Sequence, residues 1–162
     1  MNLKFYEVDS TYIDYLSQFA EHLFRNARRE QQNSRKYIGI ILEVNGFKYF
    51  VPLSSFKPKH KKMQETTDFI KIKDYAVLNI NNMLPVPDGL YEYVDINAVK
   101  DLRYKSLLQA EYREIKRKRD LILKNAKIVY THKLKNGEKT PLARRTNDFA
   151  LLEKVCGDYG NK

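Results

Sequence analysis

Two neighbouring hydrophobic runs near the centre of the chain have the composition of strands. Residues 37–44 and 47–53 are rich in β-branched and aromatic residues, and Asn45-Gly46 separates them. An Asn-Gly pair favours a type I′ turn, because both central residues of that turn need a positive φ. We therefore predict a β-hairpin, in which Pro52 should end the hydrogen-bond ladder because proline has no N–H to donate.

Further strands are predicted on both sides of this hairpin from short hydrophobic or alternating runs. The four segments are residues 3–8, 68–74, 75–86 and 90–94. The third of them is closed by two prolines, Pro85 and Pro87. Ahead of the hairpin, residues 25–36 are polar and basic, and we predict that they form a loop.

Two long segments carry hydrophobic residues at the three- and four-residue spacing of a helix. The first follows Asp9 or Ser10, either of which can cap its start, and continues to Leu23. The second covers residues 97–128, with one gap in its hydrophobic stripe at Arg119. The hydrophobic positions are Tyr12, Tyr15, Leu16, Phe19 and Leu23 in the first helix, and Tyr104, Leu108, Tyr112, Ile115, Ile122 and Ala126 in the second.

The end of the chain is predicted to be helical as well. Residues 135–138 have the composition of a turn, and Asn147 or Asp148 can cap a last helix over residues 149–156. The 162 residues fit one domain, and no linker or repeat divides them. We therefore predict a single domain, 1–162, of the α+β class. Its strongly twisted, mainly antiparallel sheet should be surrounded by helices.

Charge narrows the class of partner. Thirty Lys and Arg against twenty Asp and Glu give a formal net charge of +10. Such a balance favours a polyanion, with nucleic acid first and an anionic membrane surface second. No run of eighteen hydrophobic residues predicts a membrane span. A single cysteine, Cys156, allows no internal disulfide and no zinc-type Cys/His spacing is present, so we predict a cytoplasmic protein without a structural metal.

The stretch Pro52-Leu-Ser-Ser-Phe-Lys-Pro-Lys-His-Lys-Lys62 carries the candidate chemistry. RNA contains its own nucleophile, the 2′-hydroxyl, so cleavage needs only proton transfer and stabilisation of charge at phosphorus. Ser54, Ser55, Lys57 and His60 offer hydroxyl donors, a cation and a titratable ring. On composition alone, however, a serine pair there is more often part of a turn. The lysines are equally suited to phosphate contacts or to solvent.

The same residues resemble the ToxN/AbiQ family, endoribonuclease toxins of bacterial type III toxin–antitoxin and abortive-infection systems. The resemblance rests on residues 35–39, Arg-Lys-Tyr-Ile-Gly, on 49–60, Tyr-Phe-Val-Pro-Leu-Ser-Ser-Phe-Lys-Pro-Lys-His, and on 79–86, Asn-Ile-Asn-Asn-Met-Leu-Pro-Val. It covers nearly the whole chain in the same order, and the chain looks closest to the CptN branch. The resemblance implies a twisted antiparallel sheet similar to that of the Kid/MazF toxins.

It also implies an activity and a partner. Members cut cellular or phage mRNA without metal or cofactor and leave a 2′,3′-cyclic phosphate. Their antitoxin is a small RNA pseudoknot, which the toxin processes from a repeated precursor and which then occupies the active groove in a closed protein–RNA assembly. The family's catalytic positions fall on Ser55, Lys57 and Ser54. A non-catalytic RNA-binding regulator is the alternative that the residues alone leave open.

Basic residues around this motif are expected to bind RNA. They are His60, Lys59, Lys61, Lys62, Arg35, Lys36, Arg28, Arg29, Lys116 and Arg117. For the last two, a solvated helix face is the simpler interpretation. The chain departs from the family in having Phe56 where proline is usual, and Gln31 near the position of an active-site tyrosine. Tyr12 matches an early family tyrosine, but its place in the hydrophobic stripe fits core packing equally well.

Overall fold

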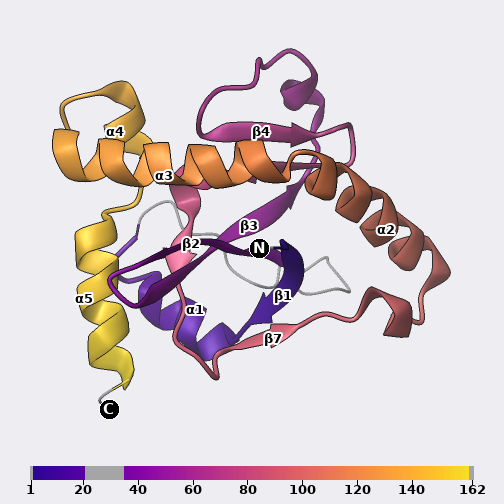
Figure 1. Ribbon diagram of the computed structural model, residues 1–162, viewed down its shortest axis with the longest axis horizontal. Coiled ribbons are helices and arrows are strands. Elements are labelled where there is room, and N and C mark those ends of the chain that lie inside the picture. The colour runs from indigo at the N-terminus through magenta and orange to yellow at the C-terminus, as the bar shows by residue number, and fades with distance from the viewer. Residues whose placement is uncertain (1, 21–34, 161–162) are drawn as a thin grey trace.

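A seven-stranded antiparallel sheet forms the centre of the molecule in the computed structural model, which describes residues 2–20 and 35–160 (Figure 1). Six strands lie in the order β4-β5-β3-β2-β1-β7, and β6 pairs with β3. The strands are β1 (Lys4–Val8), β2 (Tyr37–Val44), β3 (Phe47–Ser55), β4 (Phe69–Ile72), β5 (Ala76–Asn79), β6 (Leu84–Pro85) and β7 (Tyr91–Tyr93). The α+β class and the antiparallel sheet are therefore confirmed.

The predicted hairpin is formed by β2 and β3. Asn45 and Gly46 have φ values of 54° and 81°, as a type I′ turn requires. Past the turn the register shifts, since residues 39–41 of β2 lie opposite the single residue Phe50 of β3. Gly39 lies against the Phe50 ring, where a Cβ atom would come within 2.2 Å of Phe50 Cδ2. Only glycine fits this close approach without a shift of the ring.

The prediction that Pro52 ends the ladder is wrong. Pro52 lies opposite Tyr37, and β3 continues to Ser55 because the next residues acquire a new partner strand. Leu53, Ser54 and Ser55 pair with Leu78, Val77 and Ala76 of β5. Proline lacks only its own N–H donor. Because β3 changes its partner strand from β2 to β5 at this point, the missing donor costs few hydrogen bonds of the ladder.

The prediction of a single strand over residues 75–86 is also wrong. This segment is divided into β5, the 3₁₀ turn η2 (Ile80–Asn82) and β6. The strand predicted over 68–74 is shorter, because Lys73 adopts a φ of 50° in the turn between β4 and β5. Two further 3₁₀ turns, η1 (Pro58–Lys61) and η3 (Ile96–Ala98), follow β3 and β7.

The helix predicted over residues 97–128 is two helices, α2 (Leu102–Arg117) and α3 (Arg119–Asn136). They meet at Lys118, next to the gap in the hydrophobic stripe at Arg119. The α3 helix continues into the predicted turn and ends before Gly137, whose φ is 59°. A change of direction lets both helices pack hydrophobic side chains on the same curved sheet face.

Shorter helices complete the fold, namely α1 (Ser10–Leu16), α4 (Pro141–Arg145) and α5 (Phe149–Gly160). The predicted caps are confirmed, since Asp9 accepts a hydrogen bond from the Tyr12 N–H and Asp148 accepts one from the Leu151 N–H. The α1 helix ends at Leu16, earlier than the hydrophobic stripe predicted. The predicted end of that stripe, Leu23, lies outside the described residues.

Helices cover both faces of the sheet (Figure 1). On one face, α2 and α3 contribute Leu108, Ile115 and Val129 to the larger hydrophobic cluster. On the other, α1 and α5 contribute Leu16 and Cys156 to the smaller cluster. No described helix is long and hydrophobic enough to cross a bilayer.

Candidate active site

The two serines of the motif end the longest strand of the sheet, in the segment of β3 that pairs with β5. Successive side chains of a strand point to opposite faces, so Ser54 and Ser55 face different environments. Ser54 is buried, whereas the Ser55 side chain is exposed. Of the two hydroxyls, that of Ser55 is the one open to a large substrate.

Arg35, which lies two residues before β2, reaches the buried serine. Its Nη1 atom donates to the Leu53 carbonyl oxygen at 3.2 Å and to Ser54 Oγ at 3.3 Å. Only 8% of Arg35 is exposed, so its charge acts from behind the strand end. The sequence predicted Arg35 as an RNA contact and missed its link to Ser54. The hydrogen bond and the burial favour a role for Ser54 in holding Arg35.

Lys57 and His60 are tied together by two hydrogen bonds. The backbone N–H of Lys57 donates to His60 Nδ1 at 2.8 Å, and the backbone N–H of His60 donates to the Lys57 carbonyl oxygen at 2.9 Å. Pro58 begins the 3₁₀ turn between them. These two hydrogen bonds fix the backbone at Lys57, two residues after the end of β3.

The ring of His60 is buried between two aromatic rings. Phe56 and Phe69 each lie 5.6 Å from it between ring centroids, and 6% of His60 is exposed. Burial lowers the pKa of His60, and the neighbouring Lys59 and Lys57 lower it further. His60 was predicted to contact RNA; this environment favours a neutral ring that positions Lys57. Phe56, which stands where the resemblance led us to expect proline, packs on that ring.

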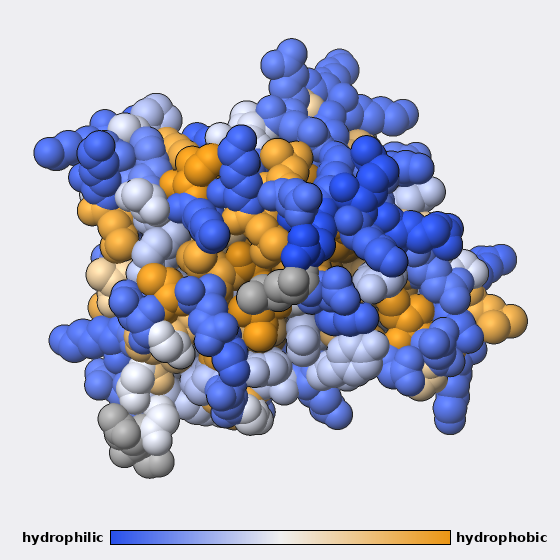
Figure 2. Space-filling model, in the orientation of Figure 1, coloured by the Kyte–Doolittle hydropathy of each residue, from blue (hydrophilic) through white to orange (hydrophobic). Residues whose placement is uncertain are grey.

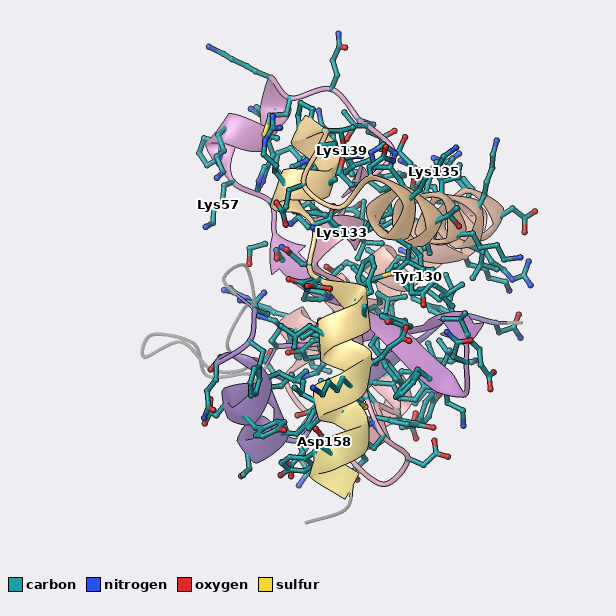
Figure 3. The ribbon with its side chains drawn as sticks, turned by 90° about the vertical axis from the view of Figure 1, so that its left-hand side faces the viewer. Lys57, Tyr130, Lys133, Lys135, Lys139 and Asp158 are labelled. Atoms are coloured by element: carbon teal, nitrogen blue, oxygen red, sulfur yellow. The ribbon has the colours of Figure 1, made fainter. Side chains whose placement is uncertain are left out.

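The Lys57 side chain projects away from the body of the protein (Figure 3). It is exposed, as are three neighbours of the same loop, Lys59, Lys61 and Lys62. None of the four forms an ion pair with a carboxylate of the described residues. The loop after β3 therefore carries uncompensated positive charge, which favours a polyanion.

Lys36 is not part of that exposed charge. It is 8% exposed, its Nζ lies 3.6 Å from Glu7 Oε1, and it sits 5.4 Å from the centroid of the Tyr104 ring. The main chain of Lys36 instead supports the site, because its carbonyl oxygen accepts the Leu53 N–H at 2.9 Å. Its predicted contact with RNA would need the side chain to leave these partners.

The basic end of α2 joins the same surface through β4. Lys71 Nζ donates to the Lys61 carbonyl oxygen at 3.4 Å, and Lys118 Nζ donates to the Lys71 carbonyl oxygen at 2.8 Å. Lys116 is exposed, whereas Arg117 is paired with Glu114, its Nε donating at 3.1 Å. Hydrophilic side chains dominate this part of the molecule, over η1, β4 and α2 (Figure 2). Arg117 is thus the less available of the two predicted contacts.

Other predicted positions lie elsewhere. Tyr12 is fully buried, and its hydroxyl donates to the Pro85 carbonyl oxygen at 2.6 Å, so core packing accounts for it. Arg28, Arg29 and Gln31 lie outside the described residues. Within residues 2–20 and 35–160, no group of three or more His, Cys, Asp or Glu side chains is arranged to hold a metal ion.

Known proteins resemble this chain over its whole length. It is 30% identical to the endoribonuclease ToxN of Bacillus thuringiensis subsp. kurstaki, with 98% of this chain and 84% of that protein covered. It is 28% identical to the endoribonuclease AbiQ of Lactococcus lactis subsp. lactis, with 100% and 92% covered. A solved structure, from work on selective toxin inhibition by a non-coding RNA pseudoknot, matches with a TM-score of 0.86 and 29% identity over 100% of both chains.

The family is shown by a match to the model of the toxin ToxN of type III toxin–antitoxin systems, which spans residues 4–157. That range includes β1 to β7 and the motif at the end of β3. The finer assignment to the CptN branch stays a prediction. This protein belongs to the ToxN family of type III toxin–antitoxin toxins.

Proposed function

We propose that this protein is a metal-independent endoribonuclease whose substrate supplies its own nucleophile. The 2′-oxygen of a ribose attacks the adjacent phosphorus, the bond from phosphorus to the 5′-oxygen breaks, and a 2′,3′-cyclic phosphate and a 5′-hydroxyl result. One proton passes from the 2′-hydroxyl to solvent water, and one is delivered to the departing 5′-oxygen. The observation that carries this proposal is the exposed pair Ser55 and Lys57, two residues apart at a fixed strand end.

Ser55 and Lys57 have complementary roles. Both side chains are exposed, and Lys57, two residues after the end of β3, has extended backbone angles (φ −108°, ψ 160°). The Ser55 hydroxyl orients the scissile phosphate, and the Lys57 ammonium stabilises negative charge on the phosphorane and protonates the 5′-oxygen. Donors aimed at developing charge contribute about 10²- to 10³-fold, and proton transfer about 10²- to 10⁴-fold.

Arg35 adds a second positive charge to this centre. Its guanidinium is anchored by the Leu53 carbonyl oxygen and by Ser54 Oγ, so it needs no reorganisation when the phosphorane forms. Ser54 acts through Arg35. A covalent intermediate on serine is disfavoured, because no described carboxylate–histidine pair lies beside either hydroxyl to take up its proton.

The exposed lysines of the loop bind the RNA backbone. Lys59, Lys61, Lys62 and Lys116 are exposed, and their charges suit contacts with phosphate oxygens. Affinity should therefore fall steeply with salt. We include Arg28 and Arg29 among the proposed RNA-binding residues because they lie in the basic segment of the sequence before β2.

The regulator proposed for this activity is an RNA pseudoknot. The solved structure that the chain resembles concerns toxin inhibition by such an RNA. Because the product of cleavage keeps the chemistry of the substrate, a processed RNA can remain on the Ser55–Lys57 site and block it. We propose that protein and RNA alternate in a closed assembly in the cytoplasm, and that the released toxin cuts cellular or phage mRNA.

Cleavage in excess EDTA, followed by analysis of the RNA ends, tests this function. Wild-type protein should yield fragments with a 2′,3′-cyclic phosphate and a 5′-hydroxyl, and Ser55→Ala should lose them. Ser106→Ala, at an exposed serine on α2, is the matched control. Tight binding with intact RNA would show an RNA-binding regulator instead. Fragments with a 5′-phosphate, or cleavage that EDTA stops, would contradict the chemistry.

A further inference from the structure

A cavity lies at the β7 edge of the sheet, opposite the edge formed by β4. It has a volume of about 350 Å³ and is enclosed by β1, the end of β7, η3 and one side of α2. Its lining mixes aromatic, cationic and amide side chains. The residues used below are Lys4, Tyr93, Asp95, Asn97, Gln109, Tyr112 and Arg113.

Two tyrosines form aromatic walls of this cavity. Tyr93 is 54% exposed, and its ring is held edge-on against Tyr6, with 6.2 Å between the ring centroids. Tyr112 is half-buried and packs on Phe5 at 6.3 Å. An exposed aromatic ring that is fixed from behind is a stacking platform for a flat ligand.

Two cations stand beside these rings. Lys4 Nζ lies 3.4 Å from the Tyr112 hydroxyl oxygen and 5.5 Å from the ring centroid. Arg113 is exposed on α2. Neither is within ion-pair distance of a carboxylate of the described residues. The cavity therefore offers positive charge for an anionic group on the ligand.

The polar lining suits the edge of a base. Asp95 is the carboxylate of the lining, and its Oδ1 already accepts the Asn97 N–H at 3.0 Å. The side-chain amides of Asn97 and Gln109 make no hydrogen bond with another described residue. Each amide can both donate and accept, as recognition of base edges requires.

We propose that this cavity binds one unstacked nucleotide of an RNA, with its base against Tyr93 and Tyr112 and its phosphate on Lys4 and Arg113. The volume is at the small end of the range for ligand pockets, which fits a single nucleotide. This inference rests on the proposed function, because it assumes an RNA ligand. It adds a binding site remote from the Ser55–Lys57 centre.

The distance of the cavity from Ser55 indicates that it contributes to RNA binding and not to the cleavage reaction. Three strand-to-strand steps separate β3 from β7, or about 14 Å across the sheet. A nucleotide held there is too far from Ser55 to take part in the chemistry. It anchors the RNA at a second point and so selects RNAs with an unpaired nucleotide at that distance from the scissile bond.

Two variants and one control test the site. Arg113→Gln removes an exposed charge, and Tyr112→Leu removes the ring but keeps a hydrophobic contact with Phe5. Arg103→Gln is the matched control, because Arg103 is exposed on the same helix but does not line the cavity. The probe is a single-stranded RNA library carrying 4-thiouridine, used for equilibrium binding and for photo-crosslinking with peptide mapping. Cleavage of an unmodified RNA by each protein is measured alongside.

We expect Arg113→Gln and Tyr112→Leu each to weaken RNA binding by roughly tenfold, with little change for Arg103→Gln. Crosslinks should map to the segment around Tyr112. Equal affinity in all four proteins, or crosslinks confined to the loop after β3, would overturn the nucleotide site. In either case, cleavage by the wild type would leave the proposed function intact. Binding without cleavage would contradict the proposed function and leave the site standing.

Discussion

The backbone N–H of Lys57 donates a 2.8 Å hydrogen bond to Nδ1 of His60, and this bond holds the candidate cation at the end of β3. An acceptor nitrogen carries no proton, so a neutral ring is required for the bond to exist. Lys57 itself is exposed and long, and a free lysine loses much rotamer entropy when it is fixed. Fixing its backbone limits the range of positions that the ammonium can reach.

Replacing His60 separates this positioning role from packing. His60→Phe keeps a buried ring between Phe56 and Phe69 but has no acceptor, so the Lys57 N–H loses its partner. We expect a fall in kcat of roughly fivefold with a smaller change in KM, since one hydrogen bond contributes about 1 kcal/mol. His60→Asn, which offers an acceptor oxygen, should retain more activity. Equal rates for the two variants would contradict the positioning role.

Acid should weaken the same contact. Burial lowers the pKa of His60 below its ordinary value of 6.5, so the native protein binds fewer protons at this site than the unfolded chain. The free energy of unfolding should therefore fall as pH drops from 6.5 through the lower native pKa. Chemical denaturation between pH 7.5 and pH 4.5 measures it. His60→Asn should reduce this slope; an unchanged slope would show that other groups cause it.

Gly39 should resist substitution. An added Cβ would lie 2.2 Å from Phe50 Cδ2, and Phe50 is fully buried. Overpacking of this kind costs about 1–3 kcal/mol, so Gly39→Ala should lower the free energy of unfolding by roughly that amount. Gly157→Ala is the control, because nothing lies within 4 Å of its Cβ position in α5. Gly157→Ala should leave the free energy of unfolding unchanged or raise it by up to about 1 kcal/mol. Equal effects would mean that the contact with Phe50 is easily relieved.

Glu111 is a buried carboxyl whose ionisation opposes folding. It is 3% exposed on α2, and burial raises its pKa from 4.5 to about 8. The native protein thus keeps a proton that the unfolded chain loses. The free energy of unfolding should therefore fall as the pH rises from 4.5 to 8. Glu111→Gln should be more stable than the wild type by a few kcal/mol at pH 8.5 and by much less at pH 5. An equal difference at both pH values would contradict the buried ionisation. Glu43→Gln, at an exposed position of β2, is the control.

Local sequence signals predicted much of this fold. The Asn45-Gly46 turn, the cap at Asp9 and the antiparallel sheet follow from turn chemistry, capping and strand composition, all of which act over a few residues. The continuation of β3 past Pro52 was not predicted from the sequence. It depends on the partner strand β5, which lies more than twenty residues further along the chain and compensates for the missing donor of Pro52. Contacts of that range leave no local pattern.

The candidate site shows the same limit of local signals. Ser55 and Lys57 could be proposed from the sequence because they lie in one recognisable segment, and their catalytic role stays a prediction. The link from Arg35 to Ser54 was missed because it depends on the register shift at Gly39. Without the shift, the turn at Asn45-Gly46 would place Arg35 level with Phe56. The shift includes Gly39, whose backbone lies against the Phe50 ring, and no spacing in the sequence predicts it.

The central claim is that the RNA attacks its own backbone, and a single 2′-deoxy substitution tests it most directly. An RNA oligonucleotide with one cleavage position is prepared in two forms, which differ only in the 2′-hydroxyl of the nucleotide on the 5′ side of the scissile bond. Single-turnover cleavage of both is measured in EDTA. We predict normal binding of the deoxy form and no cleavage at that bond. Cleavage of both forms at similar rates would show that water or a protein side chain is the nucleophile.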